Sequence, residues 1–158
     1  MGQILTLEEA VAARERLRAL GRRVVFTNGH FDLLHVGHLD YLEKARALGD
    51  ALFVGVNGDA GTAHHKGSGR PIVPAAERAR LLAALVPVTA TIIFDAATAT
   101  GLIQALQPDI YAKGGDYHHT PLPERPAVEA YGGEVVLIDY LPDHSTSAII
   151  RRIRALPG

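Results

Sequence analysis

The chain has 158 residues, of which 47% are hydrophobic and 21% are charged, a composition typical of one globular domain and not of disordered, collagen-like or coiled-coil proteins. Its formal net charge of −1 provides no basic field for nucleic acid or membranes, and the absence of cysteine excludes disulfides, Cys-ligated zinc and thiol catalysis. Because neither a signal-peptide pattern nor an apolar run of about 18 residues occurs, we expect a cytoplasmic protein with one domain over 1–158, divided into an N-terminal helix within 1–21 and a core over 22–158.

Five short hydrophobic runs predict β-strands. Each run is continuously apolar and rich in β-branched residues, rather than alternating between apolar and polar positions. Such runs are typical of strands in a parallel sheet whose two faces are both covered. The predicted strands are residues 24–27, 51–56, 91–94, 109–112 and 134–138.

Helical patterns lie between these runs. The first begins with a capping box, in which Glu9 follows Thr6 at the required spacing, and it ends at Gly21. The predicted helices are residues 6–20, 36–48, 74–86, 98–106, 124–131 and 146–156. The alternation of strands and helices predicts an α/β fold: a single Rossmann-like, doubly wound domain with a central five-stranded parallel sheet and helices on both faces.

Two polar stretches, residues 57–71 and 113–123, each begin where a predicted strand ends. In doubly wound folds ligands bind outside the carboxyl ends of the strands. We therefore expect these two loops to carry functional residues.

The sharpest local signal is the segment from Thr27 to His38, with the sequence TNGHFDLLHVGH. It runs from a strand end through a glycine-containing turn into a helix. His35 and His38 are three residues apart and therefore project from one face of the first helical turn, where free backbone N–H groups attract anions. Two imidazoles at this position predict a clamp for a polyphosphate. A capping role for the histidines is the alternative, and two ligands are too few for a zinc site.

Five further motifs follow along the chain: YLEKARALGD (residues 41–50), VNGD (56–59), KGSGRP (66–71), KGGDY (113–117) and STSAII (145–150). Together with the His-x-Gly-His segment, and in this order, they make the chain, from about residue 22 to 153, resemble the His-x-Gly-His nucleotidylyltransferases, a superfamily of cytidylyl- and adenylyltransferases. The most similar branch is the adenylyltransferase of ADP-heptose synthesis.

The resemblance implies an enzyme that joins the AMP part of ATP to D-glycero-β-D-manno-heptose 1-phosphate or another sugar 1-phosphate, releasing pyrophosphate. It implies ATP and a phosphorylated sugar as partners, Mg²⁺ that arrives with ATP, and a possible homodimer. No protein ligand for a metal is predicted. A phosphate monoester is mostly ionised at pH 7, so the acceptor needs no protein base.

The motif residues and the family resemblance together predict which residues form the site. As catalytic groups we expect His35 and His38, which contact ATP phosphates, with Lys66 and Arg70, whose charges neutralise the leaving group from a glycine-containing loop. The predicted nucleotide-binding residues are Thr27, Asn28, Gly29, Phe31, Gly37, Lys113, Gly114, Asp116, Ser145, Thr146 and Ser147. The predicted acceptor-binding residues are His30, which replaces the cysteine usual in the family, and Asp32, Asn57 and Asp59, the last of which could instead cap a turn.

Three other functions compete with this interpretation. A cytidylyltransferase that uses CTP and glycerol 3-phosphate or another polyol phosphate shares the histidine pair and the Ser-Thr helix start. A non-catalytic nucleotide-binding module is a second alternative. A dinucleotide-binding oxidoreductase is disfavoured because the first turn lacks the Gly-x-Gly-x-x-Gly pattern.

Overall fold

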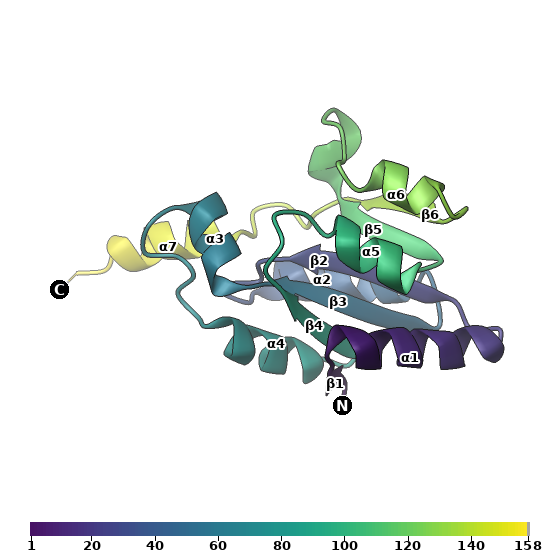
Figure 1. The fold of residues 1–158 in the computed structure, drawn as a ribbon. Coiled ribbons are helices and arrows are strands. Elements are labelled where there is room, and N and C mark those ends of the chain that lie inside the picture. Colours follow the sequence, from purple (N-terminus) through teal and green to yellow (C-terminus); the bar gives the residue numbers. More distant parts are fainter. Residues whose placement is uncertain (158) are drawn as a thin grey trace.

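A six-stranded, entirely parallel sheet forms the centre of the molecule in the computed structural model, which describes residues 1–157. The strand order is β1-β4-β3-β2-β5-β6, so the chain first builds the sheet outward from β2 and then returns to add β5 on the other side of β2 (Figure 1). The strands are β1 (Gln3–Ile4), β2 (Val24–Gly29), β3 (Ala51–Asn57), β4 (Ala90–Phe94), β5 (Ile110–Gly114) and β6 (Glu134–Ile138).

The predicted α/β class and the five predicted strands are confirmed, with two differences. The count of five strands was wrong, because β1 pairs with β4 through only two residues, Gln3 and Ile4, and such a short edge strand has no recognisable pattern. Full burial was wrong for β6, where Glu134 is exposed and the next three residues are half-buried, because β6 is the edge strand of the sheet. The interior strand β3 is buried at all seven positions.

The six predicted helices are present, and two further helical segments lie in the stretches expected to be loops. The capping box of Thr6 and Glu9 is formed at the start of the first helix. The two additional segments are α3 (Asp59–Lys66) and the 3-10 helix η1 (Gly115–His118). The other helices are α1 (Leu7–Ala19), α2 (Val36–Arg46), α4 (Ala75–Ala83), α5 (Thr100–Leu106), α6 (Arg125–Glu129) and α7 (Thr146–Arg154).

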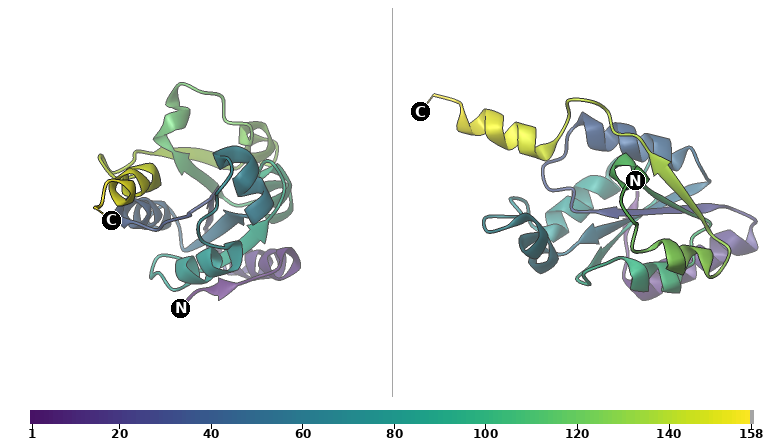
Figure 2. Two further views of the ribbon diagram at one scale, coloured as in Figure 1. Left: turned by 90° about the vertical axis from the view of Figure 1, so that its left-hand side faces the viewer. Right: turned by 90° about the horizontal axis from the view of Figure 1, so that it is seen from above.

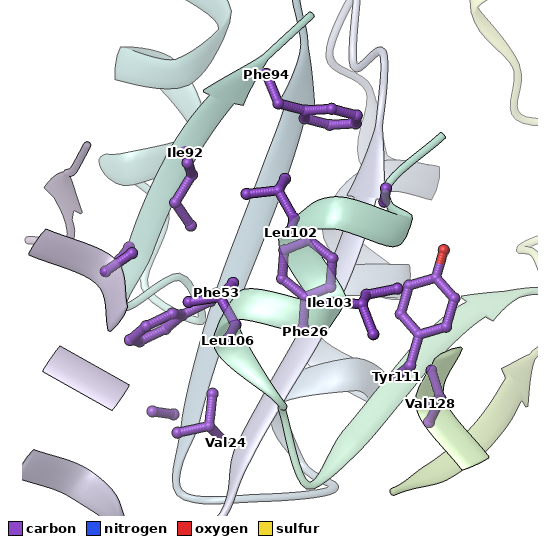
Figure 3. Close-up of a cluster of buried hydrophobic side chains, with 14 of the residues drawn as sticks. Val24, Phe26, Phe53, Ile92, Phe94, Leu102, Ile103, Leu106, Tyr111 and Val128 are labelled. Carbon is purple, nitrogen blue, oxygen red and sulfur yellow. The ribbon is translucent and has the colours of Figure 1, made fainter. Parts of the chain in front are cut away.

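The helices cover the two faces of the sheet with different cores. On one face α1, α5 and α6 pack on the strands, and their core contains Phe26, Phe53, Leu102, Ile103 and Tyr111 (Figure 3). On the other face α2 and α4 bury a second set of residues that includes Leu42, Ala45, Ala79 and Leu82. The sheet thus separates two groups of helices, and functional residues that come from α2 and from α6 approach the strand ends from opposite faces.

The last helix differs from the others in its packing. None of the residues of α7 is buried, and the helix extends away from the sheet with only its first turn close to the strand ends (Figure 2).

Within residues 1–157, no helix is long and apolar enough to cross a membrane.

Candidate active site

A cleft of about 770 Å³ opens at the carboxyl ends of the strands, where β2 and β5 lie side by side. This is the point at which the strand order reverses, and ligands of doubly wound folds bind at such a point. The ends of both strands line the cleft, through Asn28 and Gly29 from β2 and Lys113 and Gly114 from β5. The lining also includes Lys66 and Arg70 from residues 57–71 and Tyr117 from residues 113–123, so the structure brings the two predicted functional loops to one site.

The two motif histidines stack on each other at the start of α2. Their ring centroids are 3.9 Å apart. His35 is the N-cap residue, and its Nδ1 accepts a hydrogen bond from the backbone N–H of Gly37 at 3.1 Å. Nδ1 of His38 accepts the backbone N–H of His35 at 3.4 Å. A neutral imidazole whose Nδ1 is an acceptor carries its proton on Nε2, so each ring keeps one N–H donor for a ligand.

Burial keeps both rings neutral in the free protein. Desolvation, followed by the charge of His35, lowers the pKa of His38 to about 4. Desolvation, followed by the charge of His144, also lowers the pKa of His35. The capping alternative therefore describes the contacts of both Nδ1 atoms, while Nε2–H remains available as a neutral donor, so binding of phosphate by the pair stays a prediction.

Gly37 lies between the two histidines and is required for their packing. A Cβ atom at this position would lie 2.9 Å from Nδ1 of His35, too close for an ordinary contact, and 3.0 Å from Cβ of His144, close enough that this neighbour would have to shift. Gly37 thus makes room for the imidazole of His35 and for the segment that leads into α7.

The first turn of α7 provides a second helix N-terminus at the cleft. Ser145 is its N-cap, and the hydroxyl oxygen accepts the backbone N–H of Ala148 at 3.1 Å. Thr146 donates its hydroxyl proton to the carbonyl of Leu33 at 3.2 Å, so this hydroxyl holds the helix to the loop before α2. The free backbone N–H groups of the first turn and the hydroxyl proton of Ser145 are left for anions.

Arg70 is held in place by Asp32. The carboxylate of Asp32 accepts Nε of Arg70 at 2.6 Å and the backbone N–H groups of Ile72 and Val73 at 2.9 Å, and the side chain is 1% exposed. These hydrogen bonds outweigh burial and lower the pKa of Asp32. The predicted acceptor-binding residue Asp32 is therefore already occupied, and the structure gives it the role of positioning Arg70 at the cleft.

Lys66 ends α3 and faces the same cleft. It takes part in none of the ion pairs formed among residues 1–157. Gly67 and Gly69, which follow it, have φ angles of 94° and 83°, values that glycine adopts without strain. The predicted glycine-dependent turn between the two cations is confirmed.

Lys113 and Asn28 connect the ends of β5 and β2. Nζ of Lys113 donates to the backbone carbonyl of Asn28 at 3.0 Å, and the hydroxyl of Tyr111 donates to Oδ1 of Asn28 at 2.6 Å. Burial lowers the pKa of Lys113 to about 8, against an opposing contribution from the charge of Glu124. The ammonium group also lies 5.8 Å from the ring centroid of Tyr117.

His30 lies on the opposite side of the cleft from α7, against α3. Its Nδ1 is 2.9 Å from the hydroxyl of Thr62, and its ring centroid is 5.6 Å from that of His65. Burial, followed by the charge of Lys66, lowers the pKa of His30 to about 4. His30 is therefore a neutral, cleft-facing group in the free protein.

A buried arginine that the sequence analysis did not single out ties these loops together. Arg78 is 0% exposed. It donates to the backbone carbonyls of His30, Asn57 and Val73 and to the carboxylate of Asp59. An isolated arginine inside a helical pattern gives no sign of this role, because it depends on three loops that are distant in sequence.

All but two of the predicted site residues line the cleft. Thr27 is buried beneath it, where its hydroxyl lies 2.7 Å from that of Tyr41. Asp59 points to Arg78 and to the backbone N–H of Ala75, so the turn-capping alternative describes its contacts. The cleft also contains residues that were not predicted as site residues: Tyr41, His65, Ala97, Thr98, Tyr117, Pro123, Glu124, Tyr140, Leu141 and His144.

Within the described part of the chain, no three His, Asp or Glu side chains converge as metal ligands do. Two carboxylates in the segments that follow β2 and β3, Asp32 and Asp59, are paired with Arg70 and Arg78. The residues of this cleft therefore do not fit a metal ion held by the protein alone.

A family model described as cytidylyltransferase-like matches residues 26–152. This chain belongs to the cytidylyltransferase-like family. The match spans all of β2 to β6 except the first two residues of β2, and most of α7, so it includes every element that contributes to the cleft. The resemblance drawn from the sequence motifs is confirmed at the level of the family.

Several curated relatives of this cytidylyltransferase-like chain carry the name bifunctional protein HldE. The chain is 47% identical to the protein of Geotalea uraniireducens over 152 residues, which are 96% of this chain and 31% of the relative. It is 48% identical to that of Citrifermentans bemidjiense, again covering 96% of this chain and 31% of the relative. The chain thus spans about a third of the length of the curated relatives it matches.

A solved structure also has this fold. The lipopolysaccharide core biosynthesis protein from Thermoplasma volcanium GSS1 is 28% identical, with a TM-score of 0.62, covering 77% of this chain and 98% of that chain. The cytidylyltransferase-like fold is therefore found in a chain that lacks the additional length of the HldE proteins.

Proposed function

We propose that this chain is an adenylyltransferase that joins the AMP part of ATP to a sugar 1-phosphate and releases pyrophosphate. We further propose that the acceptor is D-glycero-β-D-manno-heptose 1-phosphate and the product ADP-heptose. The identity of nearly half of the aligned residues to the HldE proteins supports this choice, together with the KGGDY motif of the ADP-heptose branch. The name of the structural neighbour, a lipopolysaccharide core biosynthesis protein, is consistent with a heptose product.

The observation that carries the proposal is the stacked histidine pair at the N-terminus of α2. Its two Nε2–H groups are neutral donors at a positive helix end, beside a second helix N-terminus and the cations Lys66 and Arg70. Such a set of donors binds several phosphate oxygens, and a phosphorylated acceptor brings its own nucleophilic oxygen. The set therefore favours transfer between phosphates over hydrolysis or redox chemistry.

In the proposed reaction an oxygen of the acceptor phosphate attacks the α-phosphorus of ATP. A new P–O bond forms as the bond from the α-phosphorus to the bridging oxygen of the β-phosphate breaks, and pyrophosphate leaves with that electron pair. No proton has to be removed, because a phosphate monoester is already mostly a dianion at pH 7. The chain contributes by aligning two anions and by stabilising charge that builds up on the leaving group.

The side chains of this chain have different roles in the proposed reaction, according to their position in the cleft. His35, His38 and the first turn of α7 are the donors for the triphosphate, and Lys66 and Arg70 neutralise the pyrophosphate as it leaves. Asp32 keeps Arg70 oriented through a 2.6 Å hydrogen bond to Nε. Because the cleft offers no cluster of metal ligands among residues 1–157, we propose that Mg²⁺ enters as the complex of ATP, where it supplies charge neutralisation to the phosphates.

Pyrophosphate release tests the proposal. The purified chain is assayed with ATP or CTP against a panel of phosphorylated sugars and polyols, including both anomers of the heptose 1-phosphate and glycerol 3-phosphate. The proposal predicts release with ATP and the heptose 1-phosphate. Turnover with CTP and a polyol phosphate alone would overturn the choice of nucleotide and acceptor, and ATP binding without turnover on any acceptor would favour a non-catalytic module.

A further inference from the structure

Glu124 is a buried carboxylate in the cleft that the motifs did not indicate and that the reaction above does not use. Only 5% of the residue is exposed, yet it lines the cleft. The other two carboxylates of the lining differ from it, because Asp32 is paired with Arg70 and Asp116 is exposed. Burying a charged carboxylate costs free energy unless partners compensate it.

The partners that the structure gives to Glu124 account for only one of its oxygens. Oε1 accepts the backbone N–H of Ala99 at 3.2 Å, at the N-terminus of α5. Among residues 1–157, no ion pair involves Glu124, and no hydrogen bond to Oε2 is formed. The hydrogen bond to Ala99 explains why the side chain points inward, and it leaves Oε2 free to accept hydrogen bonds from a ligand.

The position of Glu124 separates it from the phosphate-binding end of the cleft. It precedes α6, which with α5 covers one face of the sheet, whereas the histidine pair begins α2 on the other face. An unpaired carboxylate repels phosphate, so the part of the ligands that lies beside Glu124 is uncharged. The charge of Glu124 also acts on Lys113, so the carboxylate lies near the end of β5.

The chemistry beside Glu124 selects a ligand that donates several hydrogen bonds. Thr98, which also lines the cleft, donates its hydroxyl proton to Thr100 at 3.0 Å, so it too can only accept from a ligand. An adenine ring offers one amino group, whereas a sugar offers several hydroxyl protons. The pair of acceptors therefore matches neighbouring hydroxyl groups of a sugar better than a base. The ribose of ATP and the acceptor both carry such hydroxyl groups, and the separate KM values measured below distinguish between them.

We propose that Glu124 is a specificity-determining residue that accepts hydrogen bonds from hydroxyl groups of the sugar phosphate acceptor, with Thr98 beside it. This inference rests on the proposed transferase function and deepens it, because it assigns the uncharged part of the acceptor to the face of the sheet covered by α5 and α6. Substrates that lack these hydroxyl groups would leave a buried carboxylate without its donors, which discriminates strongly against them.

The test compares Glu124→Gln with Glu129→Gln in the pyrophosphate-release assay. In Glu124→Gln the amide oxygen of the new side chain can still accept the N–H of Ala99, so the contact with α5 remains, while the charge and one acceptor oxygen are lost. Glu129 is on α6 but exposed and outside the cleft, so it is a matched control. We expect Glu124→Gln to raise the KM for the acceptor about ten-fold or more, with the KM for ATP changed less than two-fold and Glu129→Gln like the wild type.

A second comparison covers the case in which Glu124→Gln does not fold. Thr98→Val, at an exposed position, is expected to raise the KM for the acceptor a few-fold without affecting that for ATP. In the wild type, an acceptor analogue lacking one of the contacted hydroxyls should react at least ten-fold more slowly. If Glu124→Gln folds, it should have lost most of this discrimination; if it does not fold, equal rates of the wild type with the acceptor and the analogue would refute the inference.

The outcomes separate the two proposals. If the wild type turns over the acceptor and folded Glu124→Gln has an unchanged acceptor KM, the role of Glu124 is refuted and the transferase function stands. A rise in the KM for ATP instead would assign Glu124 to the nucleotide and also refute the inference. If the wild type releases no pyrophosphate with any acceptor, the proposed function fails, and the inference fails with it.

Discussion

Substitutions at His38 can separate its two ring nitrogens, because the structure gives each a different task. Nδ1 accepts the backbone N–H of His35 at 3.4 Å, which is a long and weak hydrogen bond, while Nε2–H is the donor assigned to ATP. In His38→Asn the side-chain oxygen can occupy the place of Nδ1, but nothing reaches the place of Nε2. In His38→Gln the amide nitrogen can reach the place of Nε2.

The expected loss follows from the removal of one positioned donor. Such a donor contributes about 10²–10³ in rate, or about 2.7–4 kcal/mol of transition-state stabilisation. We therefore expect His38→Asn to lower kcat by this factor while the protein remains folded, because the weak capping bond is kept. His38→Gln should turn over at least about ten-fold faster than His38→Asn.

The assay measures kcat and KM by pyrophosphate release at saturating ATP, with thermal unfolding as the control for folding. The loss of activity should appear in kcat, because the Nε2–H donor of His38 is proposed to stabilise negative charge that increases in the transition state. A folded His38→Asn variant that keeps kcat within three-fold of the wild type would refute this assignment and remove the main support for the proposed function.

Three further predictions concern stability. Asp32→Ala leaves Arg70 without its partner and two backbone N–H groups without an acceptor, so urea unfolding should show a loss of about 3–5 kcal/mol; a loss below about 1 kcal/mol would contradict this. His30 and His38 have folded pKa values of about 4 against about 6.5 when unfolded, so the unfolded chain binds more protons between pH 4 and 6.5. Stability should therefore fall from pH 8 to pH 5, by about 2 kcal/mol for His38 and by less for the more exposed His30; a stability that is flat over this range would show that the rings are not buried neutral groups. Ser145→Ala removes the N-cap of α7 and should make helix α7 exchange its amide protons faster by a factor that corresponds to about 1 kcal/mol; unchanged exchange would mean that the cap does not hold the helix.

The central fold could be predicted from the sequence, because its strands are continuous apolar runs and its helices have recognisable ends. The strand β3 is buried throughout, and the capping box of Thr6 and Glu9 forms as its spacing predicts. By contrast, α3 has one buried residue, Thr62, and contains a glycine. Its helical form depends on contacts with its surroundings, so no periodicity in the sequence predicted it.

The candidate site could be predicted where motifs place residues next to a strand end or a helix start. The stacking of His35 on His38 follows from their spacing on α2. The occupation of Asp32 by Arg70 could not be predicted, because these residues are 38 positions apart and meet only through the fold. Glu124 was missed for a similar reason: its inward orientation is set by the N–H of Ala99, on a different helix.

The contacts of Arg78 have a consequence for how this enzyme family could change its acceptor. One guanidinium group joins the carbonyls of His30, Asn57 and Val73 to the carboxylate of Asp59, so the loops after β2 and β3 and the segment before α4 are fastened to a single point. Moving any one of these segments would remove a hydrogen-bond acceptor from the buried guanidinium of Arg78, which costs free energy. Divergence toward new acceptors is therefore expected through replacement of individual cleft side chains, such as His30 and Glu124, and not through changes in the backbone of these loops.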